Sequence, residues 1–150
     1  MAENMQALAT IDVKGALSAD GPTAYSSLRS GTIKEKAALY NAMSNPKHKV
    51  GDYINKTIMV KDVYVEVVEI EDIDENGVKT GGTITAPRIV LVDTKGETYQ
   101  AVSKGVFNAL GRLFRTFGEP TWEDGLPLTV VQISLGKNQM LTLEVDEKAL

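Results

Sequence analysis

Apolar and polar residues alternate along the middle of the chain in a pattern that predicts a long strand. The segment 57–70 reads TIMVKDVYVEVVEI, and its alternation would turn Val63, Val65 and Val67 inward and Tyr64 and Glu66 outward. This run is longer than an ordinary strand. We therefore expect a bulge or a strong bend, as in a strand that serves two halves of a barrel.

Four shorter runs predict further strands, at 89–92, 97–102, 128–134 and 139–145. The turn 93–96 joins the first two of these, and an acidic, glycine-containing connection at 71–82 predicts a hairpin tip. This connection contains D-x-D-x-N-G, which is the first half of a calcium loop. The twelfth position is Thr83, where a bidentate Glu is required, so no metal site is expected.

Two helices are predicted from caps and periodicity. Ser103 caps a helix whose apolar positions are Val106, Leu110, Leu113 and Phe117. Thr32 and Glu35 have the spacing of a capping box, which predicts a helix over 32–43. The apolar face predicted for this second helix consists of Ile33, Ala37, Tyr40 and Met43.

Residues 1–30 contain glycines and show little periodicity, so we expect a flexible N-terminal arm followed by one domain at 31–150. The order within the domain is one helix, three strands, a second helix and two strands. Five strands with a helix between the third and fourth are typical of the OB-fold, a small and partly open Greek-key barrel. A β-sandwich and an α+β sheet are the alternatives.

Composition narrows the class of protein. Apolar residues make up 43% of the chain, enough for a core, and the absence of cysteine excludes disulfides and thiolate chemistry. No apolar run is long enough to span a membrane, and the N-terminus has no signal-peptide pattern, so we expect a cytoplasmic protein.

The net charge of −4 argues against nucleic acid, but the charges are unevenly distributed. Residues 31–62 carry six lysines against three acidic residues, and residues 81–115 carry five basic residues against two acidic ones. The acids are concentrated at 63–80 and 116–150. A basic groove on an acidic body and a mixed, solvated surface are both compatible with this distribution.

Catalytic signatures are missing. His48 is the single histidine, and the sequence has neither a G-x-S-x-G elbow nor a Walker loop nor G-x-G-x-x-G. We therefore expect no enzyme, no cofactor and no small-molecule substrate.

Binding of a single strand needs cations for phosphates and rings for bases, and an OB-fold presents them on strands two and three and in two loops. Mapping the sequence onto that surface gives three groups of candidates. Tyr64 and Tyr99 would stack bases; Arg88, Lys95, Lys61 and Lys137 would hold phosphates; Gln100 and Asn138 would donate or accept hydrogen bonds. Tyr99 is equally compatible with a half-buried barrel position. Tyr53 is expected to be a packing residue, and Trp122 is expected to cover the barrel end.

Several segments resemble a known family. They are GTIKEKAALYNAMSNPKHKVGDYINKTIMVKDV, IVLVDTKGETYQAVSKGVFNAL, FGEPTW and LGKNQMLTLEV. Over residues 31–145 they are similar to small phage single-stranded-DNA-binding proteins of Gram-positive hosts, with relatives on conjugative plasmids. The resemblance implies an OB-fold that coats single strands during replication or transfer. The resemblance also implies that Tyr99, Gln100 and Lys137 are DNA-binding residues.

The sequence thus predicts a non-catalytic protein that binds single-stranded DNA, or RNA, with little sequence preference. The N-terminal arm is expected to link neighbouring copies along the strand. The competing interpretation is an OB-type protein-interaction module in a larger assembly, without nucleic-acid binding.

Overall fold

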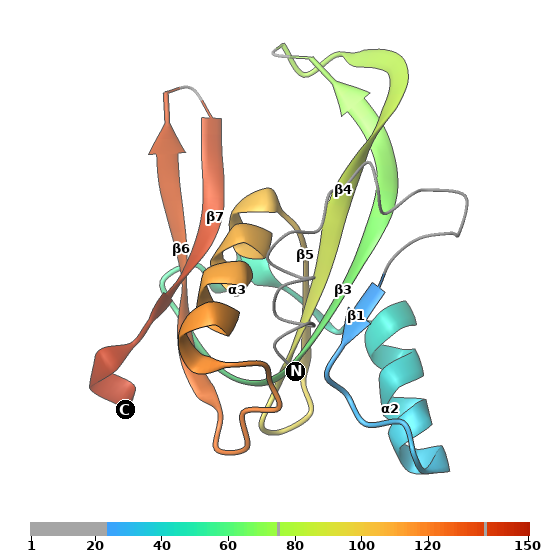
Figure 1. Ribbon diagram of the computed structural model, residues 1–150. Helices are drawn as coiled ribbons and strands as arrows, with labels where there is room; N and C mark the ends of the chain where they lie inside the picture. Colours follow the sequence, from blue (N-terminus) through green and yellow to red (C-terminus); the bar gives the residue numbers. More distant parts are fainter. Residues whose placement is uncertain (1–23, 75, 137) are drawn as a thin grey trace.

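One curled β-sheet dominates the computed structural model, which describes residues 24–74, 76–136 and 138–150 (Figure 1). The seven strands lie in the order β2-β5-β4-β3-β6-β7, and β1 pairs with β3 beside this path. The strands are β1 (Ala24–Ser26), β2 (His48–Lys49), β3 (Thr57–Ile73), β4 (Lys79–Asp93), β5 (Thr98–Val102), β6 (Leu126–Leu135) and β7 (Asn138–Val145). The helices are α2 (Ile33–Ser44) and α3 (Lys104–Phe117), with short 3₁₀ helices η2 (Val50–Tyr53) and η3 (Glu147–Ala149).

Strand β3 is bent, as its length predicted. It pairs with β6 over Thr57–Val60 and with β4 from Val60 onward. The register with β4 shifts between Val60 and Asp62 and again between Glu71 and Ile73. The predicted bulge is confirmed, and it lets one strand belong to both halves of the sheet.

The strand count and the closure of the sheet differ from the prediction of a five-stranded barrel. Two short strands, β1 and β2, join the sheet, so α3 follows the fifth strand and not the third. Among the described residues, β7 pairs only with β6, and β2 pairs only with β5. The result is an OB-like half-barrel whose open side is spanned by residues 50–54, where Ile54 makes an isolated bridge to Val130.

The beginning of the domain also differs from the prediction. Residues 24–26 lie within the predicted arm, yet they form β1 and pair in register with residues 64–66 of β3. The Tyr25 ring packs on Phe114 of α3 with centroids 5.4 Å apart. Residues 1–23, which make up most of the predicted arm, lie outside the described residues.

Helix α3 fills the inner side of the half-barrel. The Ser103 hydroxyl accepts a hydrogen bond from the Val106 N–H at 3.1 Å, which confirms the predicted cap. Its apolar side then buries Val106, Leu110 and Phe114 completely. These side chains join the main core with the inward-facing residues of the sheet, and Trp122 covers this core edge-on to Phe114.

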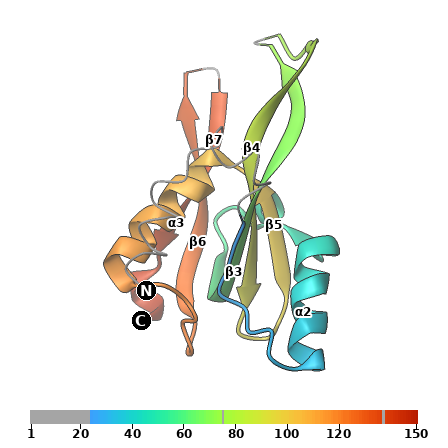
Figure 2. The ribbon, with the colours of Figure 1, turned by 45° about the vertical axis from the view of Figure 1, so that its right-hand side comes forward.

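Helix α2 lies on the opposite, outer side of the sheet (Figure 2). The predicted capping box is present, because Thr32 Oγ1 accepts from Glu35 N–H and Glu35 Oε1 accepts from Thr32 N–H. The predicted packing face is wrong. The helix packs through Leu39 and Ala42, and Ile33 and Tyr40 face solvent.

The contact between α3 and β7 allows no side chain at Gly105. A Cβ there would overlap the Leu141 carbonyl oxygen and lie 2.7 Å from Met140 Cγ. We expect Gly105→Ala to cost about 1–3 kcal/mol of unfolding free energy, as overpacking does, despite the better helix propensity of alanine. Thermal unfolding followed by circular dichroism would show this as a fall of several degrees in Tm.

Gly51→Ala is the matched control, because a Cβ at Gly51 would lie 3.9 Å from Leu141 Cδ1, an ordinary contact. Its Tm should stay close to that of the wild type. A rise in Tm for Gly105→Ala would show that helix propensity dominates and that α3 and β7 are not in close contact.

Candidate nucleic-acid interface

The outer face of β4 and β5 is where an OB-fold binds single strands, and α2 covers part of it. Tyr64 lies on this face, opposite Val63 and Val65, as its alternation predicted. Its ring nevertheless packs beneath Ala42 of α2 and is only 4% exposed. The prediction of Tyr64 as an open stacking platform is therefore wrong for this conformation, because a base cannot reach the face of a covered ring.

Tyr99 lies on the inner face and belongs to the core. The side chain is 7% exposed, and its hydroxyl donates to Asp93 Oδ2 at 2.9 Å. The ring stacks on His48 and meets Tyr53 edge-on, both with centroids 5.0 Å apart. Of the two positions that the sequence left open for Tyr99, the structure has the barrel position, so its predicted use as a stacking platform is not available.

Arg88 and Gln100 are brought together on the outer face, where the Arg88 side chain is 14% exposed. Arg88 Nη1 lies 2.9 Å from Glu66 Oε1, and Arg88 Nη2 donates to Gln100 Oε1 at 3.5 Å. Lys49 of β2 is paired in register with Gln100, which places Lys49 and Gln100 side by side. Lys49 thus lies opposite Gln100, and Arg88 lies diagonally across from Gln100 on β4, in what we call the Lys49–Arg88 row. Glu66 offsets part of the charge of Arg88.

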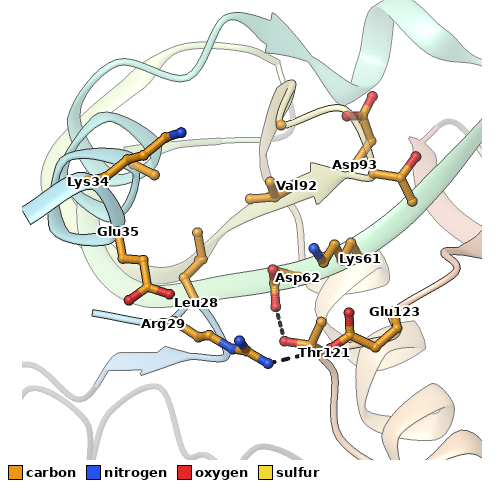
Figure 3. A pocket seen from close by; sticks show the side chains of 13 residues that line it. Leu28, Arg29, Lys34, Glu35, Lys61, Asp62, Val92, Asp93, Thr121 and Glu123 are labelled. Carbon is orange, nitrogen blue, oxygen red and sulfur yellow. Dashed lines mark hydrogen bonds and ion pairs between the residues drawn. The ribbon is translucent and has the colours of Figure 1, made fainter. Parts of the chain in front are cut away.

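Two of the remaining predicted cations, Lys95 and Lys61, do not join this row. Lys95 is exposed in the turn between β4 and β5. Lys61 lines a crevice of about 590 Å³ between α2, β3 and the loop at 121–123 (Figure 3). The crevice has mixed charge, because it also contains Asp62 and Glu123. Lys137 and the side chain of Asn138 lie outside the described residues.

The sequence prediction missed the edge of the sheet formed by Lys47, His48, Lys49, Tyr53 and Lys56, here called the β2 edge. The Tyr53 hydroxyl lies 3.2 Å from His48 Nδ1, and Lys56 Nζ is 5.6 Å from the centre of the Tyr53 ring. Both rings are partly exposed, and the His48 side chain is 32% exposed. In the sequence these residues form one dense run, KHKVGDYINK, in which rings alternate with cations.

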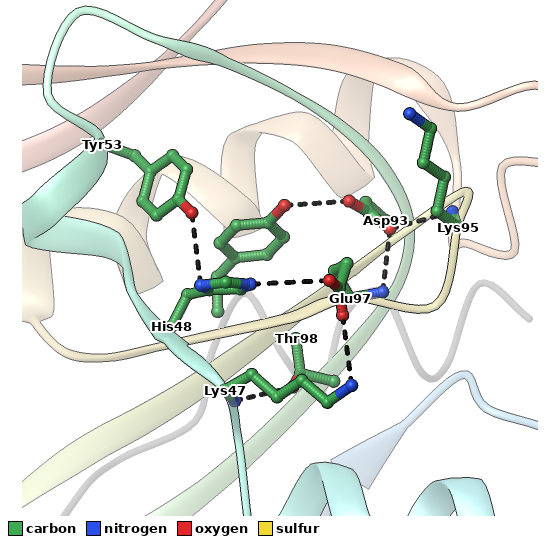
Figure 4. A network of polar contacts seen from close by, with 8 residues as sticks. Lys47, His48, Tyr53, Asp93, Lys95, Glu97 and Thr98 are labelled. Carbon is green, nitrogen blue, oxygen red and sulfur yellow. Dashed lines mark hydrogen bonds and ion pairs between the residues drawn. The ribbon is translucent and has the colours of Figure 1, made fainter.

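The Glu97 carboxylate offsets positive charge at one side of the β2 edge, where it lies beside Lys47 and His48 (Figure 4). Its carboxylate lies 3.5 Å from Lys47 Nζ and 3.8 Å from His48 Nε2. No ion pair among the described residues involves Lys49 or Lys56. These two lysines are therefore the cations of the β2 edge that remain available for phosphates.

A family model described as phage single-stranded DNA-binding protein, of the Phi29 type, matches residues 19–146. The chain belongs to this family. The match extends beyond the resemblance at 31–145 and includes β1. Searches of curated proteins and of solved structures gave no match.

Family membership supports single-stranded DNA binding as the general activity, and the family consists of DNA-binding proteins and not of enzymes. The described residues contain no group of three His, Asp or Glu side chains that could hold a metal ion. No helix in the part of the chain that the structure describes is long and apolar enough to cross a membrane.

The buried tyrosines make the folded state less stable at alkaline pH. Burial and the hydrogen bond to Glu66 raise the pKa of Tyr64 to about 12, and burial and Asp93 raise the pKa of Tyr99 above its ordinary value. The neutral phenols are thus favoured in the folded state. Their contribution is complete below pH ~10, the pKa of an unfolded tyrosine, and is lost as pH rises through the folded pKa.

We therefore expect Tm to fall steeply above pH ~10, and Tyr64→Phe to fall less steeply, because it has one fewer phenol to ionise. Tm measured by circular dichroism at several pH values tests this. The solvent-facing Tyr40→Phe is the control and should follow the wild-type profile. Identical slopes for wild type and Tyr64→Phe would show that the Tyr64 phenol does not ionise on unfolding.

Proposed function

We propose that this protein binds single-stranded DNA with little sequence preference, in phage DNA replication or in conjugative transfer of a related element. The family match over residues 19–146 is the observation that carries this function. Coating a strand requires contacts to phosphates, which are the same at every position, and to base faces, which all bases share. The competing interpretation, a protein-interaction module, predicts no binding of oligonucleotides.

The strand would cross the part of the outer face that α2 does not cover, at Arg88 and Gln100, and continue over the β2 edge. Arg88 and Gln100 would contact it on the sheet, and Lys49 and Lys56 would neutralise phosphates. This path avoids the face under α2 and meets the lysines that have no carboxylate partner among the described residues. Lys61, Lys95, Lys137 and Asn138 remain candidates for contacts farther along the strand.

Tyr53 is the ring we propose for stacking. It is partly exposed, its hydroxyl is held by His48, and its edge packs on Tyr99. A ring supported in this way loses little conformational freedom when a base stacks on it. Tyr64 and Tyr99 have no such role in this conformation, because other side chains cover both rings.

Phosphate contacts are tested by the salt dependence of binding. On single strands each neutralised phosphate contributes about 0.7 to the slope of log K against log salt. We expect Lys49→Gln/Lys56→Gln to lower this slope by about 1.4, measured by fluorescence anisotropy with a labelled dT oligonucleotide.

Lys79→Gln/Lys148→Gln is the control, because it removes the same charge at positions outside the proposed path. Its slope should equal that of the wild type. Equal losses in the two variants would mean that only net charge matters, and an absence of binding to any oligonucleotide would favour the protein-interaction module.

Stacking is tested at Tyr53. Base stacking on an aromatic ring is worth about 1–3 kcal/mol, so Tyr53→Leu should weaken dT binding by about 5-fold to 150-fold, whereas Tyr53→Phe should retain most of the affinity. Anisotropy gives the Kd, and thermal unfolding shows whether each variant is folded. Equal affinity of Tyr53→Leu and wild type would remove Tyr53 from the binding surface.

A further inference from the structure

Strands β3 and β4 continue beyond the sheet as a two-stranded hairpin that rises above the body (Figure 1). We call its described residues 68–74 and 76–86 the acidic ribbon. Over this range the two strands pair only with each other, since β1 reaches Glu66 and β5 reaches Arg88. An isolated two-stranded hairpin is marginally stable in water, so a further contact to its exposed side chains would stabilise it.

The acidic ribbon exposes apolar side chains. Ile73 is 55% exposed and Val78 is 58% exposed. Ile70 and Ile84 lie directly opposite one another on the two strands, and both are also exposed. The ribbon carries Glu69, Glu71, Asp72 and Asp74 against Lys79 alone. This surface would repel phosphates, so it fits a partner that is both basic and apolar.

Helix α2 has such a surface. Ile33, Ala37 and Tyr40, which we call the α2 stripe, lie on one side of the helix, opposite the packing residues Leu39 and Ala42. Ile33 is 82% exposed and Tyr40 is 63% exposed. Lys34 and Lys36 flank the stripe, one on each side. The apolar face that the sequence predicted for this helix therefore exists, but it faces away from its own domain.

We infer that the acidic ribbon of one copy docks on the α2 stripe of the next copy, in a head-to-tail arrangement. The charges of the two surfaces are opposite, and both expose apolar side chains that nothing covers among the described residues. The ribbon and α2 lie at opposite ends of the molecule, so one copy can use both at once (Figures 1 and 2). A heterologous contact of this kind repeats in a line.

The inference rests on the proposed function for its setting, because the line would follow a single strand of DNA. Copies bound side by side on one strand have a high effective concentration, so a weak contact between them is enough for cooperative binding. Binding to DNA that holds only one copy would not depend on this contact. This difference separates the new interface from the binding site itself.

The first test compares a dT oligonucleotide that holds one copy with long poly(dT). We expect Ile33→Ser/Tyr40→Ser, and separately Ile70→Ser/Ile84→Ser, to weaken binding to poly(dT) by about 10-fold or more and to remove its cooperativity. Neither should change the Kd for the short oligonucleotide. Leu150→Ser, at another exposed apolar position, is the control and should bind both DNAs like the wild type.

Charge reversal tests the complementarity. Lys34→Glu/Lys36→Glu should lose cooperativity, and adding Glu69→Lys/Glu71→Lys to the same chain should restore it. Restoration would not occur if the lysines contacted phosphates. A weaker Kd for the short oligonucleotide in any α2 variant would place α2 on DNA and overturn the inference. If the wild-type protein binds the short oligonucleotide but shows no cooperativity on poly(dT), the inference fails and the proposed function stands.

Disulfide cross-linking tests whether the ribbon of one copy lies beside α2 of the next. The sequence has no native cysteine, so every disulfide must come from the introduced residues. On poly(dT) under oxidising conditions, Tyr40→Cys/Ile84→Cys should form a ladder of disulfide-linked oligomers on a non-reducing gel. Each single variant should remain monomeric, and an equal mixture of the two should give dimers. Dimers from a single variant alone would indicate a symmetric contact, and no ladder would indicate no docking; either result overturns the inference.

Discussion

The fold depends on one strand that belongs to two halves of the sheet. β3 pairs with β6 near its start and with β4 along the rest of its length, and the register shift after Val60 marks the change. A flat strand could not face both partners, so the irregularity at this point curls the sheet around α3. The fully buried side chains of Val60 and Val63 on either side of the shift join the same core. The curl therefore comes from the interior packing as much as from backbone geometry.

Among the described residues the curl leaves the sheet open between its edge strands β2 and β7, and the binding site that we propose lies beside this opening. The segment after β2 spans it, which brings His48 and Tyr53 against Tyr99 and leaves their outer sides partly exposed. Meanwhile α2 covers Tyr64 on the outer face. The partly exposed rings of His48 and Tyr53 consequently lie at the edge of the sheet and not on the middle strands where a simple OB-fold presents them.

Local signals in the sequence predicted most of the elements. The caps at Thr32 and Ser103 and the bend in β3 depend on residues close in sequence, and all three are confirmed. The predictions that were missed or wrong concern features that depend on residues far apart in the sequence. β2 consists of two residues, His48 and Lys49, held by parallel pairing with Tyr99 and Gln100 of β5. The Lys47 N–H beside it donates to the hydroxyl of Thr98, 51 positions away, and no periodicity can reveal so short a strand. Tyr64 alternates as predicted, but its exposure depends on the docking of α2.

The α2 face shows why such docking is hard to predict. Ile33, Ala37 and Tyr40 give the helix its stronger apolar side, and burial of apolar surface would favour turning that side to the sheet. The small Ala42 and the single Leu39 pack there instead, which brings the helix close to Tyr64 and Val90. An apolar side left in solvent costs free energy unless a further contact covers it. Some of the acidic residues that make the net charge negative lie on the ribbon, and their charge is opposite to that of the lysines beside the α2 stripe. The uneven charge of the chain thus agrees with both proposals, DNA binding at the β2 edge and docking between neighbouring copies.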